Sequence, residues 1–170
     1  MEAVHLVRRF FASLRHQTPR AAEEAWLLAM LSPAEAELYR RQPAIDRHHS
    51  VNCALAAREQ LGARASRAVI VASALHDVGK ADTDLATFGR VGATVAGKVV
   101  PASRLCAWEA QPGLRGRMAR YAHHDKRGAR MLMDAGSHPM VVAWAQEHHE
   151  PAASWSIDPA IAQVLFDADH

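Results

Sequence analysis

The chain has 170 residues, of which 49% are hydrophobic, so it is long enough to bury one core and a single domain is expected. Twenty lysine and arginine residues against eighteen aspartate and glutamate residues leave a net charge of +2, which does not favour nucleic acid or an anionic membrane as the main partner. Two cysteines are too few for a disulfide framework, and no apolar run approaches the ~20 residues of a membrane span or forms a secretory signal, so a cytoplasmic location is expected.

Alanine, leucine, arginine and glutamate dominate the chain, and alternating β-branched residues are scarce. This composition predicts an all-α fold, a single-domain helical bundle of about eight helices. Helices within residues 1–44 are expected to pack on a core formed by residues 45–170. Helix starts are predicted at Ser32 ("SPAE", a capping box), at Ser137 ("SHP") and at Asp158 ("IDPA"). Breaks are expected at Gly62, Gly79, Pro112 and Gly136.

The segment 88–101, "FGRVGATVAGKVVP", is rich in glycine and valine and carries no regular charged face. It is interpreted as a long loop or an irregular helix that crosses the surface. Its "GATVAGKV" matches the spacing of a phosphate-binding P-loop up to Lys98, but Val99 stands where that motif needs serine or threonine, and no strand precedes it. A P-loop is therefore not favoured.

Histidine is the residue type that stands out, with eleven copies and three adjacent pairs, "RHHS", "AHHD" and "EHHE". Consecutive helical residues differ by 100°, so usually one member of a pair points at a shared interior site. His124 shares a face with small and apolar residues, whereas His123 lines up with charged ones, so His124 is expected inside. The same comparison favours His49 over His48.

The remaining candidates for the interior site follow apolar stretches of the sequence. "ALHDVGK" places His76 and Asp77 at the end of one such run. In "MVVAWAQEHHE" both His148 and His149 continue apolar faces, so both are expected to reach an interior site. Asp169 stacks over an apolar helical face, and a buried carboxylate needs a partner, for which a metal ion is one candidate.

Together these residues form a set of imidazoles and carboxylates on five expected helices. Such mixed ligation without thiolates suits Fe, Mn or Zn in a reactive, partly open site better than a closed structural zinc site. The expected cofactor is one or two divalent ions, and the choice among Mn, Fe, Zn, Ni and Mg stays open. The candidate metal ligands are His49, His76, Asp77, His124, His148, His149 and Asp169.

In order and approximate spacing, this H…HD…H…HH…D pattern resembles that of the HD-domain metal-dependent phosphohydrolases. The resemblance runs from Asp46 to Asp169 and is carried by "HHSVNCALA", "ALHDVGK", "HHDKRGARML" and "EHHEP". It implies an HD-like helical core over residues 45–170, in which segment 88–101 is an irregular insertion. It also implies a binuclear centre in which Asp77 bridges two ions, the first held with His49, His76 and Asp169 and the second with His124, His148 and His149.

By the same resemblance, the expected activity is metal-dependent hydrolysis of a small phosphorylated molecule or nucleotide. Asp77 and Lys80 are the expected catalytic residues, since an ammonium ion at Lys80 can bind a substrate phosphate. Without the adjacent His-Asp pair, Lys80 is better explained as a cation at a helix C-terminus. Lys126 and Arg127 are candidates to guide an anionic substrate, although a solvated helix face is the simpler explanation for both.

Two differences from the HD-domain family pattern narrow the expected activity and the expected number of metal ions. The Gly-Tyr-Pro signature of relatives that cleave cyclic dinucleotides is missing after "EHHE", and Ile45 stands where relatives with three metals carry glutamate, so no more than two ions are expected. Two alternatives stay open at the level of sequence. One is an HD-type di-iron oxygenase, and the other is a catalytically silent metal-containing sensor or interaction domain.

Overall fold

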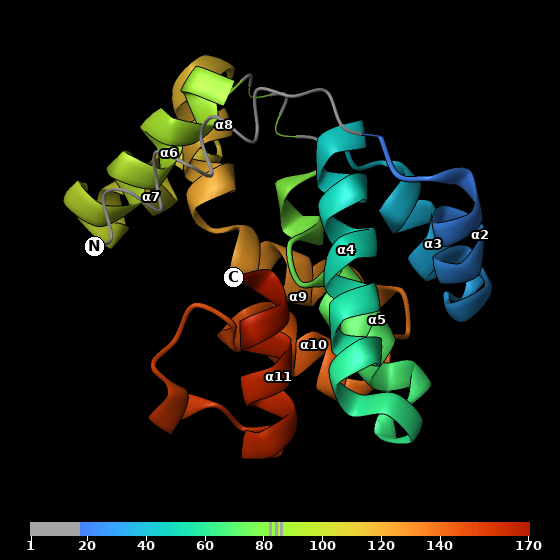
Figure 1. Ribbon diagram of the computed structural model, residues 1–170. Coiled ribbons are helices and arrows are strands. Elements are labelled where there is room, and N and C mark those ends of the chain that lie inside the picture. Colours follow the sequence, from blue (N-terminus) through green and yellow to red (C-terminus); the bar gives the residue numbers. More distant parts are fainter. Residues whose placement is uncertain (1–17, 82, 84, 86) are drawn as a thin grey trace.

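The computed structural model of the chain describes residues 18–81, 83, 85 and 87–170. These residues form ten α-helices and three short 3-10 helices, and no strand occurs among them (Figure 1). The prediction of an all-α chain is confirmed, with more α-helices than the eight or so expected. The first part of the expected N-terminal helices, residues 1–17, lies outside the described residues.

The central element of the core is α5 (Arg67–Leu75), which is surrounded by α4 (Ala44–Leu61), α10 (Pro139–Glu147) and α11 (Pro159–Asp169). Every residue from Val69 to Leu75 is buried, as expected for a helix that is apolar on all sides. The helix therefore delivers whatever follows Leu75 directly into the interior.

The other helices of the core lie around this axis. Helix α9 (His124–Asp134) packs on α10, and α2 (Ala21–Met30) packs on α4 and α5. Helices α2 and α3 (Pro33–Arg40) lie together on one side of α4 (Figure 1). None of the described helices combines the length and the apolar character that a membrane crossing needs.

Three helices, α6 (Thr87–Val99), α7 (Ala102–Glu109) and α8 (Gly113–Ala122), gather at one end of the molecule (Figure 1). Helix α6 covers most of segment 88–101, so this segment is a helix and not a surface loop. It also follows that "GATVAGKV" has helical backbone instead of forming a glycine-rich phosphate loop.

Packing explains why this glycine-rich segment is helical. Ala93 and Ala96 are buried, and α6 packs on α8. A Cβ atom added at Gly92 would lie 3.4 Å from Met118 Cε, and one added at Gly97 would lie 3.4 Å from Ala122 Cβ. Small residues on this face thus let two helices approach closely, and this contact outweighs the low helix propensity of glycine.

The predicted helix starts are confirmed with one change of capping residue. Ser32 Oγ accepts a hydrogen bond from the Glu35 amide at 3.2 Å, and Glu35 Oε2 accepts one from the Ser32 amide at 2.8 Å. The Asp158 carboxylate caps α11. At α10 the cap is His138 and not Ser137, because His138 Nδ1 accepts from the Met140 amide at 3.1 Å. The remaining short elements are η1 (Gly62–Arg64), η2 (Val78–Lys80) and η3 (Ala152–Ser154).

Candidate metal centre

The seven residues selected from the sequence converge on one place in the core. They come from α4, from the chain just after α5, from the start of α9, from the end of α10 and from the last turn of α11. Asp77 lies in their middle. Its Oδ1 is 3.2 Å from His124 Nε2 and 3.5 Å from His148 Nε2, and its Oδ2 is 3.7 Å from His76 Nε2.

Gly79 makes this convergence possible. Helix α5 ends at Leu75, ahead of His76 and Asp77, and Gly79 lies inside the short helix η2 instead of ending the long one. A Cβ atom at Gly79 would lie 1.9 Å from His124 O and 2.6 Å from Gly128 N. Only glycine lets η2 rest directly on the first turn of α9, and this contact holds Asp77 beside His124.

The backbone fixes the orientation of three imidazole rings. In His76, His124 and His148, Nδ1 lies 2.8–3.0 Å from the carbonyl oxygen of the residue three positions earlier. A carbonyl oxygen can only accept, so Nδ1 carries the proton and Nε2 presents a lone pair. Buried metal-binding histidines are usually held in this way.

These lone pairs face carboxylate oxygens, which are also acceptors. His76 Nε2, His148 Nε2 and Asp77 Oδ1 are buried and have no hydrogen-bond partner among the described residues. Buried acceptors that face each other are costly unless a cation or a proton lies between them. The donor set therefore fits a metal ion.

His49 and Asp169 complete the cluster on the side of α4 and α11. His49 Nε2 lies 2.9 Å from Asp169 Oδ1, which is also 3.5 Å from His76 Nε2. One residue in this part was not selected from the sequence: the buried thiol of Cys53 lies 3.5 Å from His49 Nε2. Its position one helical turn after His49 was a usable signal for it, because residues at i and i+4 are neighbours.

Both carboxylates of the cluster are ionised. Burial alone raises the pKa of Asp77, but the Lys80 ammonium outweighs it and holds that pKa well below its usual value. Burial likewise acts against ionisation of Asp169, yet the hydrogen bond from His49 keeps its pKa below the usual range. Two largely buried negative charges are thus available to hold cations.

The imidazoles at the two edges of the cluster differ. Burial lowers the pKa of His49, but the hydrogen bond with Asp169 outweighs this effect and raises the pKa to about 10. Burial and the neighbouring His148 and His124 lower the pKa of His149 to about 3, so this ring is neutral at pH 7. His149 is the exposed member of the cluster, and its Nε2 lies 3.1 Å from His124 Nε2. It therefore marks the open side of the centre.

The ligand atoms fall into three overlapping groups, and within each group they lie within 4.8 Å of one another. Two of the groups share Asp77: one is Asp77, His124, His148 and His149, and the other is His49, His76 and Asp77. The third group is His49, Cys53 and Asp169. Nitrogen and oxygen donors of this kind suit Mn, Fe, Zn or Ni.

The outer histidines of two His-His pairs lie outside the metal cluster, whereas one of the expected cations contacts it. His48 contacts Asn52, and His123 Nδ1 lies 2.7 Å from Glu109 Oε1, so both point away from the cluster. Lys80 forms an ion pair with Asp77.

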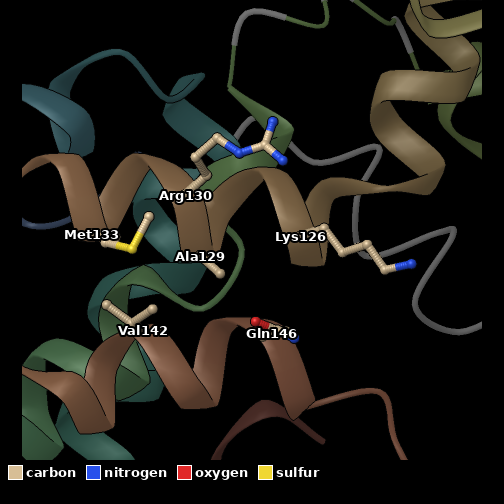
Figure 2. Close-up of a pocket in the computed structure, with 6 residues that line it drawn as sticks. All are labelled: Lys126, Ala129, Arg130, Met133, Val142 and Gln146. Atoms are coloured by element: carbon tan, nitrogen blue, oxygen red, sulfur yellow. The ribbon is translucent and has the colours of Figure 1, made fainter. Parts of the chain in front are cut away.

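Lys126 lies in a surface groove between α9 and α10, where Ala129 and Met133 face Val142 and Gln146 (Figure 2). None of the seven cluster residues lines this groove. Arg127 is half-buried on α9, one turn after His124. Of the three expected substrate-binding cations, Lys80 is paired with the cluster carboxylate Asp77.

A further group beside Lys80 was not identified from the sequence. Arg90 of α6 binds Asp46 of α4 through two hydrogen bonds, and the ring of Tyr121 lies next to both Arg90 and Lys80. Arg90 falls in the segment interpreted as a loop or irregular helix. Its partner is 44 positions away along the chain, so no local pattern links the two.

Comparisons of the chain with protein-family profiles, with curated proteins and with solved structures find no match.

Proposed function

We propose that the chain is a metal-dependent phosphohydrolase of the HD-domain type, which releases phosphate from a small phosphorylated molecule or nucleotide at a binuclear centre. The observation that carries the proposal is the position of Asp77 between two ligand groups. Its Oδ1 faces His124 and His148, and its Oδ2 faces His76. A carboxylate whose two oxygens face different sets of imidazoles is suited to bridge two ions.

Two divalent ions held in this way supply a nucleophile at neutral pH and stabilise the charge on the leaving oxygen. The chain's own residues contribute the surroundings. The apolar end of α5 excludes water from the inner side of the centre, and the partly exposed His149 and Lys80 mark the side from which a substrate enters. From there, the Lys80 ammonium can donate to a non-bridging phosphate oxygen.

We assign the substrate contact to Lys80 and not to Lys126 or Arg127. The Lys80 side chain is 17% exposed and touches Asp77, so it reaches both the ligand cluster and the solvent. Burial lowers its pKa, but the Asp77 carboxylate outweighs this effect and raises the pKa above the usual value, so Lys80 is charged at neutral pH. Lys126 lies in the groove of Figure 2, which contains no candidate ligand.

The test begins with metal analysis of the purified protein, followed by loading with Mn²⁺, Fe²⁺, Zn²⁺, Ni²⁺ or Mg²⁺ in turn. Phosphate release is then measured with a panel of nucleotides and phosphomonoesters. We expect turnover with at least one metal and a loss of about a hundredfold or more in His76→Ala and Asp77→Asn. His48→Asn, which changes the outer histidine of the same helix, is the matched control and should retain full activity.

A metal-loaded protein that releases no phosphate from any ester would overturn the proposal. Oxygen consumption by the anaerobically iron-loaded protein, with a mixed-valence signal on exposure to air, would replace it with a di-iron oxygenase. A protein that unfolds on metal removal and turns over nothing would instead be a sensor or interaction domain with a structural metal.

A further inference from the structure

Beside the Lys80 side of the metal cluster lies a second polar group that the proposed chemistry leaves unused. Arg90 Nη1 and Nη2 lie 2.6 and 2.9 Å from the two oxygens of Asp46, and Arg90 Nε donates to Leu85 O at 3.1 Å. The guanidinium carbon lies 5.9 Å from the centroid of the Tyr121 ring. Arg90 is therefore held in place from three directions.

Tyr121 connects this group to the metal cluster. Its ring centroid is 5.7 Å from Lys80 Nζ and 5.9 Å from the His124 ring, so one aromatic ring borders two cations and a candidate ligand. Lys80, Tyr121 and Arg90 thus form a row that begins beside Asp77.

The side chains of this row supply several hydrogen-bond donors. A guanidinium group has five N–H donors, and among the described residues Arg90 directs three of them to Asp46 and Leu85. The Tyr121 hydroxyl and the Lys80 ammonium add further donors. Because Asp46 occupies one edge of the guanidinium, Arg90 cannot swing toward Asp77 without losing two charge-assisted hydrogen bonds.

The ion pairs of the row bear on anion binding. Arg90 pairs with Asp46, and Lys80 pairs with Asp77. A divalent ion held by the Asp77 oxygens would compete with Lys80 for this carboxylate. The Lys80 ammonium would then be released to bind another anion.

We propose that Lys80, Tyr121 and Arg90 form an anion subsite next to the metal centre and that this subsite selects the terminal phosphate of a phosphomonoester over the phosphate of a diester. The proposal rests on the function proposed above. A terminal phosphate carries two charges and three free oxygens, so it can contact the metal centre and the subsite at once. A diester has one charge and only two free oxygens, which the metal centre alone engages.

The first experiment measures binding and does not depend on turnover. Inorganic phosphate is titrated by calorimetry into the metal-loaded protein and into the metal-free protein. We expect Arg90→Met to weaken phosphate binding about tenfold and Tyr121→Phe to weaken it several-fold, without change in metal content. Arg130→Met removes a cation of the same type from the surface groove of Figure 2, and we expect it to bind phosphate like the wild type.

The second experiment compares two substrates, p-nitrophenyl phosphate and bis(p-nitrophenyl) phosphate. We expect Arg90→Met to raise KM for the monoester about tenfold and to leave KM for the diester unchanged. Removing Arg90 alone leaves Asp46 partly buried without its partner, so the double variant Asp46→Asn/Arg90→Met serves if the single variant does not fold.

The outcomes separate the two proposals. Weaker phosphate binding in the variants with no turnover in any form supports the subsite and rejects the phosphohydrolase. Turnover with phosphate binding and monoester KM unchanged in a folded Arg90 variant rejects the subsite and keeps the phosphohydrolase. Equal losses for monoester and diester reject the proposed selectivity.

Discussion

Glu35 and Asp77 are both buried carboxylates next to helix termini, yet their neighbours are of opposite kinds. Glu35 is 1% exposed and accepts hydrogen bonds from the Ser32 amide at 2.8 Å and from Arg67 Nη2 at 2.7 Å. Asp77 is 9% exposed and faces the unprotonated Nε2 atoms of buried histidines, with Lys80 as its one cationic contact among the described residues.

The difference is whether the hydrogen-bonding capacity of the buried carboxylate is satisfied by protein donors. Donors surround Glu35, so its burial stabilises the fold without further partners. Apart from Lys80, the neighbours of Asp77 are acceptors, so a further cation would make its burial more favourable. Burial alone does not distinguish a carboxylate with a complete set of donors from one that fits a metal ion, but the hydrogen-bonding character of the neighbours does.

The largest expected effect tests this contrast with metal. At a metal concentration about a hundredfold above Kd, binding should stabilise the protein by about 2.7 kcal/mol, which raises Tm by about 5 to 10 °C. Asp77→Asn should lose this shift, whereas Glu35→Gln should keep it, because Glu35 takes no part in the cluster. Differential scanning calorimetry with and without metal measures both. An equal shift in the wild type and Asp77→Asn would show that the ion binds elsewhere.

The second effect concerns the contact that holds Asp77 in place. An added methyl group in Gly79→Ala meets backbone atoms of α9 at 1.9 and 2.6 Å, so we expect a loss of about 2 kcal/mol of stability and at least tenfold weaker metal binding. In Gly97→Ala the nearest atom is a side-chain carbon at 3.4 Å. This control should be neutral or stabilised by about 0.5 kcal/mol through helix propensity. Urea unfolding measures the stability of the two variants, and metal titration measures their affinity. Equal stability and equal metal affinity in Gly79→Ala and Gly97→Ala would exclude a special role for Gly79.

The smallest effect concerns Glu35 and depends on pH. Burial acts to raise the pKa of Glu35, but the Ser32 amide, the Ser137 hydroxyl and the Arg67 charge together lower it below the usual 4.5. The folded state therefore binds this proton less readily than the unfolded state, so the stabilisation is complete above pH 4.5 and is lost as the pH falls through the lower folded-state pKa.

We expect Glu35→Gln to cost about 1 kcal/mol at pH 7, and this difference from the wild type to shrink below pH 4.5. Urea unfolding of the metal-free proteins at pH 7, 5 and 4 provides the measurement. If the difference in stability between the wild type and Glu35→Gln grew as the pH fell, it would contradict a lowered pKa of Glu35 in the folded state.

Helical periodicity was sufficient to predict which histidines face inward, because the face of a residue depends only on its position within its own helix. It predicted that His124 faces inward while His123 faces outward, and the structure buries the first and pairs the second with Glu109. It also favoured His49, which lies 2.9 Å from Asp169. The capping box at Ser32 is local in the same sense, since both of its hydrogen bonds join residues three positions apart.

What the sequence did not reveal depends on contacts between distant segments. Glycine and valine lower helix propensity, and the packing of α6 on α8 accounts for the helix over most of segment 88–101. Gly79 looked like a helix terminator, whereas its importance comes from the closeness of α9. The ion pair between Arg90 and Asp46 was missed for the same reason. That the cluster binds metal and hydrolyses phosphate stays a prediction.

The pairing of His49 with Asp169 implies an order of assembly for the proposed centre during synthesis. Asp77, His124, His148 and His149 precede Asp169 in the chain, so the half of the centre on the side of α9 and α10 can form first. The half on the side of α4 needs α11, which packs on α4. If the proposed binuclear centre forms, a nascent chain stalled before α11 should hold one ion, and a second ion should bind only after α11 has docked.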